Sequence, residues 1–155
     1  MFRVRSRLAL LATMLTAAFL MTGCSTLAEQ QTDTMPDENL ASLQNTYWKL
    51  ITLNGQPIQM SSGQREAHLI LKLENRVQGY SGCNAFRGKF SQQAETLSFG
   101  PIMMTRRACL PDNHHESVLM QLMQGDVSWS ISGEQLDLHN PTHKLNATFQ
   151  AVYLQ

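Results

Sequence analysis

The chain has 155 residues, which is enough for one domain with a single core and additional terminal segments. Twelve basic residues balance twelve acidic ones, but three arginines fall within residues 1–23, which contain no acid. Residues 24–155 therefore hold nine basic and twelve acidic groups, a net charge of −3. This balance argues against a nucleic-acid partner, because phosphate binding needs a clustered excess of Lys and Arg. A hydrophobic share of 43% excludes a wholly disordered chain, and three cysteines are too few for a disulfide-rich miniprotein.

Residues 1–23 have the pattern of a bacterial export signal. The three arginines precede an unbroken run of apolar or small residues from Leu8 to Leu20. This run is shorter than the roughly 20 apolar residues that a membrane-spanning helix needs, and its length is typical of the apolar part of a signal peptide. We therefore predict that residues 1–23 are a signal peptide.

The end of this run predicts a lipid anchor. The segment Leu20-Met21-Thr22-Gly23-Cys24 resembles the lipobox of bacterial lipoproteins, with Met21 where that motif usually has Leu. The resemblance implies that Cys24 is acylated, becomes the mature N-terminus and holds the protein to a lipid bilayer. Ser25 follows in place of Asp, which by resemblance to Gram-negative sorting favours the outer membrane, with the protein facing the periplasm. The alternative is an ordinary secretory signal in which Cys24 only falls near the cleavage site.

Residues 24–44 are predicted to be the lipidated N-terminus and a flexible linker. After Cys24 this segment has no aromatic residue and no hydrophobic period, and it is rich in Gln, Thr, Asp and Glu. Fully extended, such a linker reaches on the order of 65 Å, so the folded domain is free to stand well clear of the lipid surface.

From residue 45 onward the sequence changes to short alternating segments separated by turn signals, and we assign the folded domain to residues 45–155. Asn54-Gly55 is a strong hairpin signal after the first segment, and Glu74-Asn75 is typical of a turn. Leu69, Leu71 and Leu73 alternate along one apolar face. The strands expected in this half of the domain cover residues 46–53, 68–73, 77–81, 85–91 and 96–99.

One helix is expected after Asn113, because Asn113 and Glu116 fit a capping pattern. In this pattern the Asn113 side chain caps the helix N-terminus, and the Glu116 side chain reaches back to the backbone of Asn113. Apolar residues at 118, 119, 122 and 123 give this helix one buried face, and Gly125 suits its end. Further strands are expected over residues 127–131, 136–138 and 145–153. About eight short strands and one helix predict a mainly β (α+β) fold, a curled antiparallel sheet or small barrel with the helix plugging one side.

Two segments carry a resemblance to a known family. Residues 81–90, SGCNAFRGKF, are similar to the GCN-x-Φ-x-G-x-Φ signature (Φ apolar) of the META domain, the HslJ-like family, and residues 97–109 are similar to its second signature. Trp48 in the first strand and the helix with Glu116 follow the same order, so the resemblance covers most of residues 45–154. The matched motif residues, which we interpret as structural, are Gly82, Cys83, Asn84, Phe86, Gly88, Thr105 and Cys109.

The resemblance implies a compact antiparallel β-barrel-like domain with one helix. It also implies a lipoprotein or periplasmic setting and a loose association with heat shock, envelope stress and secretion. No catalytic residues are established for the family, so none carry over to this chain.

Cys83 and Cys109 are the cysteines that remain once Cys24 is lipidated. An even pair in an oxidising compartment is a candidate disulfide. A bond that closes a loop of about 26 residues would stabilise the fold by roughly 3.5 kcal/mol on the chain-entropy model. The alternatives are two buried free thiols in neighbouring loops, or a redox-active pair, although no CxxC motif is present to lower a thiol pKa.

The five histidines and nine methionines raise the question of a metal site. His139 and His143 are spaced i, i+4, which can clasp zinc on a helix, but Pro141 between them makes this segment a turn. By strand parity His68 and His139 face outward, where histidines are usually solvated. The methionines fit core filling better than copper binding; those concerned are Met103, Met104, Met120 and Met123. We predict no metal and no cofactor.

Four cations form the candidate partner surface. Arg106 and Arg107 lie near Arg87 and Lys89 if the two signature segments adjoin, and they would then make a small basic patch. Such a patch suits lipopolysaccharide phosphates or an acidic partner, and the alternative is a solvated surface without a partner.

We therefore predict a non-catalytic, outer-membrane-anchored lipoprotein with a META domain, which binds an envelope protein in envelope maintenance or stress response. The chain has no GxSxG or HExxH motif. One alternative is a protease-inhibitor or secretion-pilot-like interaction module, which predicts an exposed apolar groove or a protruding loop at Gly100–Arg107. The other is a metal-binding or redox protein.

Overall fold

The computed structural model describes residues 40–59, 65–109 and 115–153. The predicted signal peptide, Cys24, most of the predicted linker, and Asn113 and His114 lie outside these ranges. The described elements are β1 (Tyr47–Leu53), β2 (Gln56–Pro57), β3 (His68–Lys72), the 3₁₀ turn η1 (Leu73–Asn75), β4 (Arg76–Tyr80), β5 (Ala85–Gln93), β6 (Thr96–Phe99), β7 (Met103–Met104), α1 (His115–Leu122), β8 (Gly125–Ser132), β9 (Gln135–Asn140) and β10 (Leu145–Val152).

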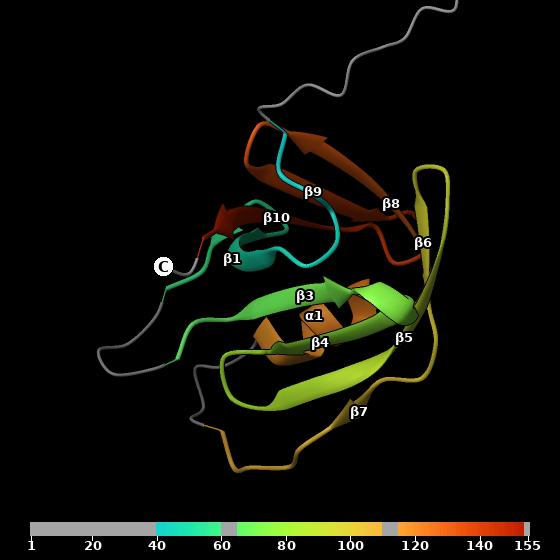
Figure 1. The fold of residues 1–155 in the computed structure, drawn as a ribbon. Helices are drawn as coiled ribbons and strands as arrows, with labels where there is room; N and C mark the ends of the chain where they lie inside the picture. Colours follow the sequence, from blue (N-terminus) through green and yellow to red (C-terminus); the bar gives the residue numbers. More distant parts are fainter. Residues whose placement is uncertain (1–39, 60–64, 110–114, 154–155) are drawn as a thin grey trace, which may run out of the picture. The chain divides into compact units, whose positions relative to one another are not determined.

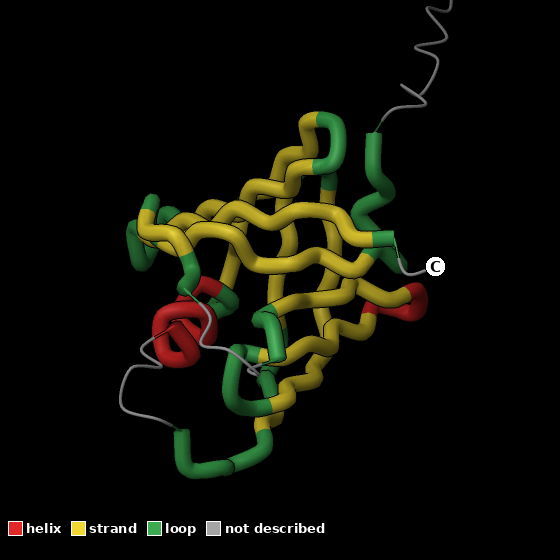
Figure 2. Tube along the Cα trace, turned by 90° about the vertical axis from the view of Figure 1, so that its left-hand side faces the viewer, coloured by secondary structure: helices red, strands yellow, loops and turns green. Residues whose placement is uncertain are grey.

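Eight antiparallel strands close into a barrel, shown in Figures 1 and 2. Their order is β1-β3-β4-β5-β6-β8-β9-β10, and β10 pairs back onto β1. The two remaining strands are short: β2 forms a hairpin with β1, and β7 pairs with the start of β5. Closure leaves the barrel strands without free edges. The predicted fold class, mainly β with one helix, is confirmed.

The barrel interior is filled by the apolar residues that alternate along each strand. Trp48 is fully buried at the start of β1, and its indole Nε1–H donates a hydrogen bond to the Leu43 carbonyl at 3.0 Å. The other large, fully buried side chains of the barrel strands come from almost every strand around it: Leu69, Leu71, Val77, Leu97, Val127, Leu136, Leu138 and Phe149.

Helix α1 packs against β1 and β10. Its Leu119 and Leu122 are completely buried, and Met123 follows in the same core. The apolar face that the sequence predicted therefore faces the barrel. Among the residues that the structure describes, no helix is long and apolar enough to cross a bilayer.

Residues 40–46 belong to the packed domain. Ala41 and Leu43 are buried in the core, and the Ala41 N–H donates to the Gly133 carbonyl in the β8–β9 turn at 2.9 Å. Asn45 N–H donates to the Leu71 carbonyl of β3 at 2.7 Å. The packed structure therefore begins before residue 45, where the change in sequence pattern placed the start of the domain.

Two predicted core positions are exposed. Leu73 was assigned to the apolar face of a strand, but it is 59% exposed, because β3 ends at Lys72 and the chain turns at Glu74 and Asn75, both with positive φ. Met103 was assigned to core filling, but it is also 59% exposed, because β7 places it on the outer face opposite Arg87. Met104 and Met120 are partly buried against the core.

Candidate functional site

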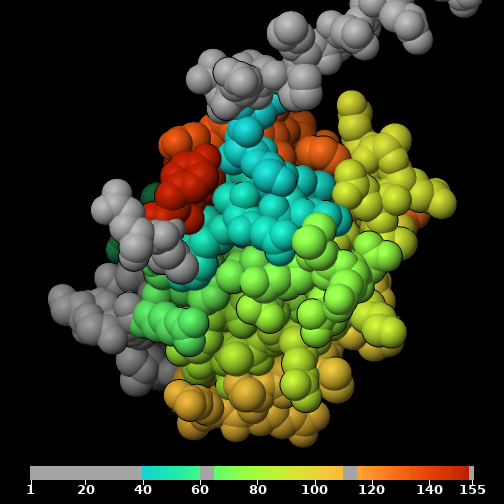
Figure 3. All heavy atoms as spheres, viewed as in Figure 1, coloured from blue at the N-terminus to red at the C-terminus, as the bar shows by residue number. Residues whose placement is uncertain are grey.

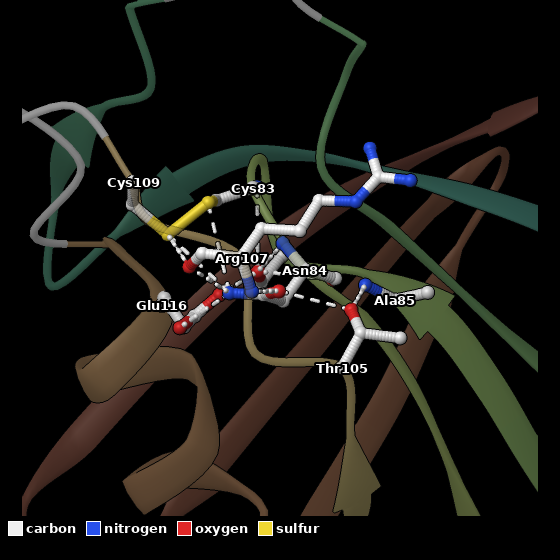
Figure 4. The surroundings of a disulfide bond; sticks show 8 residues. Cys83, Asn84, Ala85, Thr105, Arg107, Cys109 and Glu116 are labelled. Atoms are coloured by element: carbon white, nitrogen blue, oxygen red, sulfur yellow. Dashed lines mark hydrogen bonds between the residues drawn. A yellow bond between two sulfur atoms is a disulfide. The ribbon is translucent and has the colours of Figure 1, made fainter.

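The two signature segments meet beside the N-terminal turn of α1 (Figure 4). The loop between β4 and β5 supplies Ser81 and Asn84, the segment after β7 supplies Thr105 and the Arg107 backbone, and α1 supplies Glu116. We call these five residues the polar cluster. The cluster joins three parts of the chain that are far apart in the sequence.

Asn84 is the centre of the polar cluster. Its side chain is buried, and its Oδ1 accepts hydrogen bonds from the Thr105 hydroxyl at 2.9 Å and from the Arg107 N–H at 2.7 Å. Its Nδ2 donates to Glu116 Oε1 at 3.2 Å and approaches Cys109 Sγ at 3.3 Å. The amide thus uses both its acceptor and its donor groups, which a different side chain of similar size would not do.

Ser81 fixes the loop that carries Asn84. Its hydroxyl donates to Glu116 Oε2 at 2.5 Å and accepts the Asn84 N–H at 3.0 Å. Gly82 has φ +96°, a backbone conformation that favours glycine, and this explains the glycine of the GCN motif. Glu116, which the sequence assigned to the helix cap, hydrogen-bonds Ser81 and Asn84 through its carboxylate, while its predicted capping partner Asn113 lies outside the described residues.

Cys83 and Cys109 are joined by a disulfide, with their Cα atoms 5.7 Å apart (Figure 4). The bond covers the polar cluster and ties the β4–β5 loop to the segment after β7. Ligand atoms of Cys83, Cys109 and Glu116 lie within 4.8 Å of one another. Zinc and copper bind thiolates, so this group offers no such site while the two sulfurs are bonded to each other.

Gly88 and Phe86, also in the first signature, have packing roles. A Cβ on Gly88 would lie 2.6 Å from Ile102 Cδ1 and 3.0 Å from the Pro101 carbonyl oxygen. The absence of a side chain therefore lets residues 101–102 pack directly against β5. Phe86 is buried, and its ring occupies the space beside Gly79.

The predicted partner surface is exposed. Arg87 and Lys89 lie on the outward face of β5, and Arg106 and Arg107 are exposed in the segment after β7. The Asn84 bonds to Thr105 and Arg107 bring these two segments together. In Figure 4 the Arg107 guanidinium points away from the polar cluster, so only its backbone takes part in the cluster.

His68 is not a solvated surface histidine, although it does face outward. It is 4% exposed, because its ring stacks on Tyr47 with centroids 4.2 Å apart and lies near Tyr80 at 6.4 Å. Burial lowers the pKa of His68. Burial and the neighbouring Glu66 carboxylate raise the pKa of Tyr47 to about 12. A hydrogen bond from Lys49 lowers the pKa of Glu66. His139 is exposed, as predicted.

Besides a groove of about 390 Å³ along residues 85–87 and 103–105, two grooves open on the surface near β7. One, of about 550 Å³, is lined by cations of β4 and β5 together with Pro101 and Met103. The other, of about 400 Å³, lies between residues 99–104 and the end of α1 and is lined largely by apolar side chains, among them Met120. The second groove is the kind of feature that the interaction-module alternative predicted near Gly100–Arg107.

A small closed antiparallel barrel, plugged by one helix and fastened by a disulfide over a buried asparagine, defines the structural class of this domain. The META domain family model matches residues 41–153, so the chain belongs to the META domain family. The resemblance found in the two signature segments is thereby confirmed. The match begins at residue 41, where the first buried side chain of the described structure is found.

Solved structures show the same fold. One, an NMR structure of a protein from Burkholderia xenovorans, has 22% identity and a TM-score of 0.58, and the alignment covers 72% of this chain and 85% of that one. A second NMR structure has 20% identity and a TM-score of 0.58, covering 71% of this chain and 94% of that one. A search of curated proteins found no significant match.

Sequence reasoning did not find the roles of Ser81 and Glu116. Ser81 precedes the GCN motif and gave no signal of its own. Glu116 had a local explanation as a capping residue, and only the fold brings it to Asn84, which is 32 residues away in the chain. The available signals in the sequence were the position of Ser81, a polar residue just before the GCN motif, and the position of Glu116, an acidic residue at the start of the helix.

Proposed function

We propose that this chain is a non-catalytic binding module, held by acylated Cys24 at the periplasmic face of the outer membrane, which contacts another envelope protein. The observation that carries the proposal is the contrast between the inside and the outside of the barrel. The interior is filled with apolar side chains, whereas four exposed cations and two grooves lie together around β5 and β7.

The polar cluster supports a structural role for the signature residues. Asn84, Ser81 and Glu116 hydrogen-bond one another, and Cys83 and Cys109 are bonded in the disulfide. A buried polar network of this kind fixes one conformation of the surrounding loops. The rigidly held segment after β7 then presents Arg106 and Arg107 to a partner, and such pre-organisation reduces the entropy lost on binding.

A second candidate function is favoured by the apolar groove beside α1. A secretion-pilot or inhibitor module needs a site for an apolar segment of another protein, and the groove of about 400 Å³ at residues 99–104, which has apolar side chains in its lining, supports this role. We propose this as a more specific form of the same binding role.

The test is chemical crosslinking in the native envelope followed by pull-down of the tagged, lipidated chain. The anchored protein should recover a specific envelope protein, and the Cys24→Ala chain should not. An Arg106→Gln/Arg107→Gln variant should lose that partner, whereas Lys144→Gln, in the exposed β9–β10 turn, should retain it. Recovery of bulk membrane proteins alone would contradict the proposal.

A further inference from the structure

A row of three cations crosses the outer face of the barrel. Lys72 on β3 lies opposite Arg76 on β4, and Arg76 lies opposite Lys89 on β5. All three face outward, because their respective sequence neighbours Leu71, Val77 and Phe90 are buried in the core. We call Lys72, Arg76 and Lys89 the basic row. The family signatures do not contain Lys72 or Arg76, and neither is among the four cations of the predicted partner surface, whereas Lys89 belongs to both groups.

Two of the three charges of the basic row have no acidic partner among the described residues. Like charges directly opposite one another destabilise a sheet, so the basic row lowers the stability of the β3–β4–β5 sheet. Glu74 pairs with Arg76 at 3.1 Å and offsets one charge of the row, although the pair adds little to stability because both side chains are largely exposed. Across residues 40–59, 65–109 and 115–153, Lys72 and Lys89 have no acidic partner. The surface therefore keeps a concentrated positive field.

Apolar side chains stand beside these cations. The groove of about 550 Å³ lies along Arg76 and Lys89, and Arg87 and Met103 continue its lining. Met103 and Leu73 are each 59% exposed, and they lie next to Arg87 and Lys72, respectively. Figure 3 views this side of the domain, where residues 65–90 (green) adjoin the segment of residues 100–109 (gold). Cations beside exposed Leu and Met are typical of a surface that meets an anionic bilayer.

We propose that the basic row, with Arg87, binds the phosphates of anionic lipid headgroups, while Met103 and Leu73 enter the interface between headgroups and acyl chains. Neighbouring strands place the cations of the row about 5 Å apart, and Arg87 lies about 7 Å along β5, so four cations occupy about 10 by 7 Å. These are spacings of the backbone, and they place four positive charges close together on one face of the sheet. The exposed Leu73 and Met103 beside these cations favour a lipid surface, because an acidic peptide would contact the cations alone. The lipid contact shares Arg87 and Lys89 with the proposed protein contact, and it differs from it in using Lys72 and Arg76 in place of Arg106 and Arg107.

The experiment measures lysine accessibility in the full, lipidated chain. The protein is reconstituted into vesicles of phosphatidylcholine, or into vesicles in which about a third of the lipid is phosphatidylglycerol. A water-soluble acetylating reagent then modifies exposed lysines, and mass spectrometry gives the rate at each one. Lys144 is the internal reference, because it is exposed in the β9–β10 turn and lies outside the basic row.

Phosphatidylglycerol should slow acetylation of Lys72 and Lys89 at least about fivefold relative to Lys144, and high salt should abolish the effect. Arg76→Gln/Arg87→Gln should weaken the contact about 25-fold, since each cation near an anionic surface is worth about a factor of five. The matched control Arg106→Gln/Arg107→Gln removes the same charge and should keep the protection.

Three results would overturn the inference. The first is equal acetylation of Lys72 and Lys89 in both kinds of vesicle. The second is equal protection by inorganic phosphate in phosphatidylcholine vesicles, which would identify a free anion as the ligand. The third is stronger protection by polyglutamate, which would identify an acidic protein segment. Retention of the protein on phosphatidylcholine vesicles reports separately on the anchor, so failure of the anchoring proposal is distinguishable.

Discussion

Removal of the Asn84 side chain tests whether the polar cluster holds the fold together. The Asn84→Ala variant loses two neutral hydrogen bonds, from the Thr105 hydroxyl and the Arg107 N–H to Asn84 Oδ1, each worth about 1 kcal/mol. It also loses the bond from Asn84 Nδ2 to the Glu116 carboxylate, which is worth about 1.5–3 kcal/mol. Thr105 and Arg107 are exposed, so water replaces part of this loss. We expect the free energy of unfolding to fall by about 3 kcal/mol.

The assay is urea unfolding of the oxidised protein, followed by tryptophan fluorescence, since Trp48 is fully buried. With a slope of about 1.5 kcal/mol/M, the midpoint should fall by about 2 M. Asn146→Ala is the control: Asn146 is exposed on β10, and its replacement should change stability by less than about 0.5 kcal/mol. A loss below about 1 kcal/mol in Asn84→Ala, with an unchanged slope, would refute the argument that the cluster is a structural lock.

Three further predictions concern other parts of the domain. Reduction of the Cys83–Cys109 bond should lower the free energy of unfolding by about 3.5 kcal/mol, and a Cys83→Ser/Cys109→Ser chain should show no response to the reductant in the same urea assay. Burial lowers the folded-state pKa of His68, so the unfolded chain binds a proton first as the pH falls, and the free energy of unfolding should decrease below about pH 6.5. The His68→Phe variant should flatten this pH dependence between pH 7.5 and 5.5. An unchanged pH dependence would exclude His68 as its source. Gly88→Ala should cost about 1–3 kcal/mol in thermal or urea unfolding because its Cβ meets Ile102 at 2.6 Å. Gly100→Ala, whose Cβ would lie no closer than 3.6 Å to the Lys89 carbonyl oxygen, should be nearly neutral, and equal losses at the two positions would contradict the packing argument.

The sequence by itself determined the local structure, because local structure depends on near neighbours in the chain. Asn54-Gly55 specifies a two-residue hairpin turn, and both residues have the positive φ that the turn requires. The alternation at residues 96–99 gave β6 with the same bounds as the structure. The two signature segments identified the family, since their order and spacing are a property of the sequence alone.

Only the tertiary structure decided which distant residues meet. β1 pairs with β10 across nearly the whole domain, and this pairing turns an open sheet into a barrel. Glu116 had a local role in the sequence, yet the packing of α1 brings it to Ser81, which is 35 residues away. His68 faces outward, as its parity predicts, but the Tyr47 ring buries it.

The basic row depends on tertiary structure in the same way. Lys72, Arg76 and Lys89 fall in three different strands, and no spacing in the sequence marks them as neighbours. Strand register alone sets them side by side, since a shift of one residue would turn each strand's side chains to the opposite face. The family and the strands of this protein are therefore properties of the sequence, whereas its polar cluster and its charged surface are products of pairing between distant segments.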